Sequence, residues 1–209
     1  MKSRNLLAVA ATLALVGLSS PALAQSPGDW TLGVGVHAVE PKSDNGTLAG
    51  TLRADVDEDI RPTITAEYFI GDNLGIEVLA AAPFKHDIRL DGAKAGETKH
   101  LPPVVSLQYH FNSQGRVSPF LGLGVNYTRF FEERSNPEGP LAGAGLKLDG
   151  SWGLAAHAGL DFRISDRSAL RVDARWIDIE TDVSVEGLGK VGSADLDPIV
   201  YGVAWIWKF

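Results

Sequence analysis

The C-terminal end of the chain alternates between two kinds of side chain. Every second residue is apolar or aromatic, at Ile199, Tyr201, Val203, Trp205, Trp207 and Phe209. The residues between them are mostly smaller, and Lys208 is the one charge among them. A period of two is that of a β-strand with one face in apolar surroundings. The final strand of a bacterial outer-membrane barrel needs such a face, because it must contact lipid and close the barrel.

The N-terminal end has the features of a secretory signal peptide. Lys2 and Arg4 precede an apolar run over residues 6–18, and Ala22-Leu23-Ala24 matches the small-x-small pattern of a cleavage site. A retained membrane anchor is the alternative, but the apolar run is short for a spanning helix. We therefore expect residues 1–24 to be a signal peptide and residues 25–209 to form one mature domain.

The charge and composition limit the class of partner. The formal net charge of the chain is −7, and removal of the two cations Lys2 and Arg4 takes it to −9. A nucleic acid is not expected as a partner, because phosphate binding requires a basic surface. The chain has no cysteine, so no disulfide is available to stabilise it. A closed barrel can cross a membrane without a spanning helix, because it pairs its backbone groups internally.

The rest of the sequence contains about eight runs of alternating apolar residues, the number in the smallest usual barrel. They cover residues 30–39, 61–70, 74–87, 100–111, 119–131, 151–164, 169–183 and 195–209. The connections alternate between short turns (71–73, 112–117, 165–168) and long loops (41–60, 88–99, 132–150, 181–194). This pattern predicts an all-β, eight-stranded antiparallel transmembrane barrel in the outer membrane of a Gram-negative bacterium, with both termini periplasmic.

Charged and polar residues occupy the opposite phase from the aromatic ones, which favours a membrane barrel over a soluble barrel with an apolar interior. Because isolated charges inside a narrow barrel are costly, we expect them to pair. The predicted polar network of the lumen comprises Arg61, Glu67, Glu77, Asp161, Arg163, Arg171, Asp173 and Arg175. Such a network would plug the lower lumen.

An apolar path is expected above the polar network. Inward-phase residues on the third, fourth and fifth runs would line an upper funnel, namely Leu79, Ala81, Val104, Phe120 and Phe130. Gly122 and Gly124 beside them would leave room for a cavity, although small barrels are commonly filled by side chains. Pro83, Pro102 and Pro103 interrupt the strands, either as a simple end of the hydrogen-bonded ladder or as a gap in the wall for lateral exit of an apolar solute.

The sequence predicts no cofactor, no metal site and no catalytic residue. The five histidines lack metal-binding spacing, and the acidic cluster at residues 55–59 lacks the spacing of a calcium loop. His37, His110 and His157 fit inward positions as hydrogen-bonding residues of the lumen. His86 and His100, at the outer ends of neighbouring strands, are placed to meet across a hairpin, where a metal or pH-sensitive site is the functional alternative. A lipid-modifying enzyme would need a Ser/His/acid group at the outer rim, and no serine there has a convincing partner.

Several longer blocks resemble the outer membrane protein W (OmpW) family. They are residues 73–86 (NLGIEVLAAAPFKH), 100–103 (HLPP), 119–131 (PFLGLGVNYTRFF), 151–153 (SWG) and 196–198 (LDP). The resemblance implies an eight-stranded outer-membrane barrel that passes small hydrophobic molecules. Arg171, Asp173 and Arg175 depart from the neutral or aromatic residues that family members often carry there.

The expected partners are therefore outer-membrane lipid, a small hydrophobic solute and, through the C-terminal Phe209, the barrel assembly machinery. A surface receptor or structural protein with a plugged lumen is the alternative, because loops on a rigid barrel commonly carry binding.

Overall fold

A computed structural model describes residues 25–141 and 143–209. Within them, eight strands form a closed antiparallel barrel, which confirms the predicted fold class. The barrel strands, in their order around the wall, are β1 (Trp30–Glu40), β4 (Asp59–Gly71), β5 (Leu74–Ala81), β8 (Val104–His110), β9 (Val117–Ser135), β11 (Ser151–Ser165), β12 (Ser168–Ile177) and β15 (Ile199–Lys208). The pairing of β15 with β1 joins the two ends of the sequence, and the pairing of β9 with β11 completes the ring.

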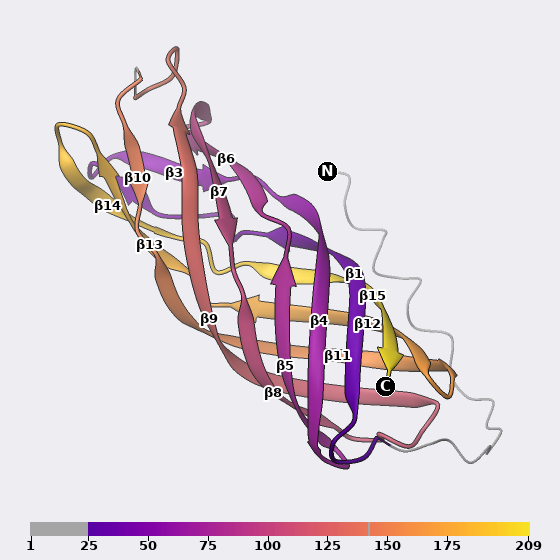
Figure 1. The fold of residues 1–209 in the computed structure, drawn as a ribbon. Coiled ribbons are helices and arrows are strands. Elements are labelled where there is room, and N and C mark those ends of the chain that lie inside the picture. The colour runs from indigo at the N-terminus through magenta and orange to yellow at the C-terminus, as the bar shows by residue number, and fades with distance from the viewer. Residues whose placement is uncertain (1–24, 142) are drawn as a thin grey trace.

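The long connections are themselves strands, whereas the sequence analysis treated them as loops. β2 (Thr47–Leu48), β3 (Leu52–Val56), β6 (Phe84–Leu90) and β7 (Ala93–Leu101) continue the sheet from the long strand β9. β10 (Leu146–Leu148), β13 (Glu180–Val185) and β14 (Gly189–Asp195) form a separate three-stranded sheet. Together these seven strands form an extracellular extension beyond one end of the barrel, at the upper left of Figure 1.

The outer face of the barrel is apolar, as a lipid-facing surface must be. Large exposed apolar side chains alternate along every barrel strand, for example Trp30, Leu32, Val34 and Val36 on β1. On the extracellular extension, by contrast, the one large apolar residue that is exposed among those described is Leu188, in the turn between β13 and β14. The apolar band therefore marks the barrel as the membrane-spanning part and places the extension outside the membrane. Among the described residues, no helix is long and apolar enough to cross a membrane.

The third predicted strand is divided in two. The run over residues 74–87 forms β5, which ends at Ala81, and β6, which begins at Phe84. Proline cannot donate a ladder hydrogen bond, and Pro83 stands at this division. Pro102 and Pro103 divide β7 from β8 in the same way on the neighbouring segment.

Candidate functional site

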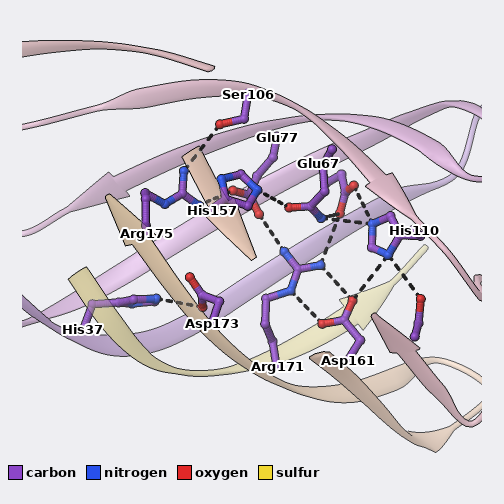
Figure 2. A network of polar contacts seen from close by, with 12 residues as sticks. His37, Glu67, Glu77, Ser106, His110, His157, Asp161, Arg171, Asp173 and Arg175 are labelled. Atoms are coloured by element: carbon purple, nitrogen blue, oxygen red, sulfur yellow. Dashed lines mark hydrogen bonds and ion pairs between the residues drawn. The ribbon is translucent and has the colours of Figure 1, made fainter. Parts of the chain in front are cut away.

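Arg171 on β12 is the centre of an ionic cluster inside the barrel. Its Nε and Nη2 donate to both carboxylate oxygens of Asp161, at 2.7 and 2.8 Å. Nη1 donates to Glu77 at 2.6 Å, and Nη2 lies 3.3 Å from a carboxylate oxygen of Glu67. All four residues are buried, and they converge from β4, β5, β11 and β12 (Figure 2). One buried cation therefore faces three carboxylates.

Arg175 supplies a second cation, because its Nη2 donates to Glu77 at 2.6 Å. We call Glu67, Glu77, Asp161, Arg171 and Arg175 the ionic cluster. Three further side chains extend it toward β8 and β11: Gln108 donates to Glu67, His110 contacts Glu67, and His157 donates to the Gln108 carbonyl oxygen. The cluster needs small neighbours, because a Cβ at position 75 would overlap the Glu67 carboxylate and one at position 122 the His157 ring.

Three residues predicted for the polar network lie apart from Arg171. Asp173 pairs with His37 at 3.1 Å. Arg61 pairs with Asp59 near the extracellular end of β4, and Arg163 donates to backbone oxygens of residues 113 and 114 at the opposite end of the barrel. The alternation along a strand shows which side chains point into the barrel, but not how far along the barrel axis each one lies. These three residues therefore point inward, as the cluster does, without joining it.

Phe120 belongs to the polar region and not to the apolar funnel in which the sequence analysis placed it. The Arg171 guanidinium lies over its ring, 4.4 Å from the centroid, which is a cation–π contact. Gly122 and Gly124 do not open a cavity beside it, since His157 and Ser106 occupy the space that a Cβ would fill. Leu79, Val104 and Phe130 lie in the buried apolar core, and Ala81 lies half-buried against that core.

An apolar cavity of about 180 Å³ lies inside the extracellular extension. Residues from all seven of its strands line the cavity, including Leu48, Leu90, Leu146, Leu148 and Val183, and Phe130 borders it from β9. His86 and Thr98 are the polar residues of the lining. The sequence analysis missed this cavity, although the short alternating segments Leu146-Lys147-Leu148 and Val183-Ser184-Val185 were the signal for it.

The barrel wall is unpaired next to this cavity. β5 pairs with β8 up to Leu79 opposite Val104, and β6 pairs with β7 from Phe84 opposite His100. Between these two pairings, residues 80–83 and 101–103 face each other without ladder pairing. We call these two segments the wall gap. Its sides carry three alanines and the three prolines that the sequence analysis singled out.

Comparison with known proteins identifies the family. The model of the OmpW family matches residues 27–209. Outer membrane protein W of Vibrio cholerae is 36% identical over 202 residues, covering 91% of this chain and 93% of that protein. The chain belongs to the OmpW family.

Two further relatives agree with this assignment. The crystal structure of the outer membrane protein OprG from Pseudomonas aeruginosa superposes with a TM-score of 0.81 at 32% identity, covering 89% of this chain and 98% of that one. A dibenzothiophene metabolism operon protein, PahQ, from the same species is 29% identical over 206 residues, covering 90% of this chain and 91% of that protein. This OmpW-family member is therefore an outer-membrane barrel of a Gram-negative bacterium.

Four buried rings separate the cavity of this OmpW-family barrel from its wall gap. They are Phe84, His86, His100 and Phe130, and we call them the ring cluster. The His100 ring lies 4.8 Å from that of His86 and 5.6 Å from those of Phe84 and Phe130, measured between centroids. Phe84 and His100 are the first paired residues above the gap, while His86 and Phe130 line the cavity.

Hydrogen bonds fix the tautomers of both histidines in the ring cluster. The backbone oxygen of Asp57 can only accept, so His86 Nδ1 must donate to it. In neutral His86, Nε2 is then an acceptor, and His100 Nε2 donates to it over 3.3 Å. Burial lowers the pKa of His86, and burial together with the neighbouring His86 lowers the pKa of His100 further.

Metal-binding side chains are not grouped in the part of the chain that the structure describes. Among residues 25–141 and 143–209, no three His, Cys, Asp or Glu side chains are grouped to hold an ion. Ser118 lies beside the His110–Glu67 pair, with its hydroxyl 3.4 Å from His110 Nδ1. This serine is buried at the end of the barrel away from the extension, rather than at the outer rim that a lipid-modifying enzyme would use.

Proposed function

We propose that this barrel lets small hydrophobic molecules enter the outer membrane through the extracellular cavity and the wall gap. The observation that carries the proposal is the position of an apolar cavity above an unpaired part of the wall, with the ring cluster between them. A solute in the cavity is removed from water, and each Å² of its apolar surface gains ~25 cal/mol on leaving water. Lateral exit then delivers it to the hydrocarbon of the bilayer.

The ionic cluster supports lateral rather than axial passage. Glu77 of the cluster lies two residues before Leu79, where the pairing of β5 with β8 ends, so the buried charges occupy the lumen on the side of the wall gap away from the cavity. An apolar solute would have to displace charged groups that hold one another at 2.6 to 2.8 Å, and a buried cation separated from its partners is strongly unfavourable. The path of lowest free energy therefore leaves the barrel above the cluster.

The size of the cavity supports a small solute. An engineered protein cavity of ~150 Å³ with an apolar lining binds benzene, and the cavity here is slightly larger at about 180 Å³. The relative PahQ is named for an operon of dibenzothiophene metabolism, and dibenzothiophene is an aromatic compound. We therefore propose single-ring aromatic molecules as suitable test solutes, and we assign the chain no enzymatic activity.

Uptake of labelled p-xylene by intact Gram-negative cells that lack other OmpW-family proteins tests this function. Cells with the protein should take up p-xylene faster than cells without it. Ala81→Trp places a large ring beside the wall gap and should reduce uptake to the rate without protein. The control Ala156→Trp places the same ring on the lipid-facing side of β11, where the wall is paired on both sides, and should leave uptake unchanged. Equal uptake with and without the protein would refute the proposed function.

A further inference from the structure

The second nitrogen of His100 is a buried hydrogen-bond acceptor without a partner. His100 is 0% exposed, and its Nδ1 has no hydrogen-bond partner. Because Nε2 donates to His86, Nδ1 of the neutral ring carries a lone pair. Buried polar groups are nearly always hydrogen-bonded, so an unused acceptor at this depth requires an explanation.

The position of His100 connects this acceptor to the solute path. His100 lies between Phe84 and Phe130, at the upper border of the wall gap. A solute that moves from the cavity to the gap must pass the ring cluster, since the cluster is the buried layer between them. The aromatic rings offer apolar contact to such a solute, and His100 Nδ1 offers one place for a hydrogen bond.

We propose that the ring cluster selects apolar solutes that carry one hydrogen-bond donor, such as a phenolic hydroxyl, and that His100 Nδ1 accepts that hydrogen bond during passage. This inference rests on the proposed function and adds the class of solute. The tautomer chain from Asp57 through His86 to His100 keeps the acceptor lone pair free. A hydrocarbon of the same shape passes the same rings without this hydrogen bond.

A matched pair of solutes tests the selection, because p-cresol differs from p-xylene by a hydroxyl in place of a methyl group. Saturable uptake by cells with the protein should favour p-cresol by about two- to tenfold, the range that one net hydrogen bond gives. In His100→Phe, which keeps a ring but removes the acceptor, this preference should disappear while uptake of p-xylene continues. The methyl ether of p-cresol has an oxygen but no donor, and should behave like p-xylene.

A measurement on the unchanged protein covers the case in which His100→Phe does not fold. In lipid bilayers, the ¹⁵N resonance of His100 Nδ1 should be that of an unprotonated ring nitrogen, and it should shift with p-cresol but not with p-xylene. Uptake of both solutes with no preference, or a preference that survives in His100→Phe, would overturn the selection and leave the proposed function intact. Uptake of neither solute would refute the proposed function itself.

Discussion

At the scale of single residues, Arg171 is the side chain on which the interior of the barrel most depends. It is buried and contacts Asp161, Glu77 and Glu67. Arg171→Met would leave three buried carboxylates with Arg175 as their remaining cation, and removing one partner of a buried ion pair costs about 3–5 kcal/mol. Urea unfolding of the barrel in lipid should show a loss of this size. Arg163→Met removes a partly exposed arginine with two backbone contacts and should cost about 1 kcal/mol or less; equal losses would contradict the central role of Arg171.

The sequence predicted which side chains of the interior are polar, but not which of them meet. Alternation places Glu67, Asp161 and Arg171 on one face of their strands, and a charged interior implies pairing. Two partners of Arg171, Glu67 and Glu77, come from strands about a hundred residues away in the sequence, and the heights of all these side chains depend on strand tilt and stagger. Phe120 was misplaced for the same reason, since phase alone does not separate a funnel from the ionic cluster below it.

At the scale of elements, the β6–β7 hairpin should be sensitive to acid. Burial lowers the pKa of His86 and His100, and Asp57, Asp59 and Arg61 are the charged groups that act on His86. Below the ordinary histidine pKa of ~6.5, the opened hairpin takes up protons that the closed hairpin does not bind. The histidines therefore contribute their full stabilisation of the hairpin above about pH 6.5, and this contribution falls as the pH decreases toward the lowered pKa values.

Hydrogen exchange of β6 and β7 amides, corrected for intrinsic rates, measures this effect. Protection should decrease between about pH 7.5 and about pH 5, and the double variant His86→Phe, His100→Phe should lose the pH dependence. The β13–β14 hairpin belongs to the same extension and contains no histidine, so its protection should stay constant. A parallel decrease in both hairpins would assign the effect to the extension as a whole.

The sequence located the barrel strands better than the strands outside the membrane. A lipid-facing strand must expose an apolar side chain at every second position, so its alternation is long and easily recognised. β10 has three residues and β2 has two, which is too short for a period to be read. Pro83, Pro102 and Pro103 predicted an interruption of the ladder, but the sequence could not indicate that pairing resumes above it between β6 and β7.

At the scale of the whole molecule, the two sides of the wall gap differ in structure. The extension buries an apolar cavity outside the membrane, and the ionic cluster fills the lumen on the far side of the wall gap. The charged side chains of the barrel strands therefore lie in the interior, paired with one another, while the outer face of the same strands is apolar. Unpaired charges at this depth of a membrane would be costly. The eight-strand closure followed from the number and length of the runs, whereas the cavity depends on strands from four separate connections.

Assembly of the whole molecule should depend on its last residue. Phe209 is 75% exposed, and its backbone nitrogen donates to Trp30 at 2.9 Å where β1 and β15 close the barrel. Phe209→Asp puts a charge on the lipid-facing edge, which is unfavourable near a membrane, and removes the aromatic residue that we propose the assembly machinery recognises. The amount of heat-modifiable barrel in the outer membrane should decrease severalfold. Leu188→Asp makes the same change at a residue that is 74% exposed in the extracellular extension, and should assemble normally. Unchanged levels of folded Phe209→Asp barrel would show that closure and recognition do not require this ring.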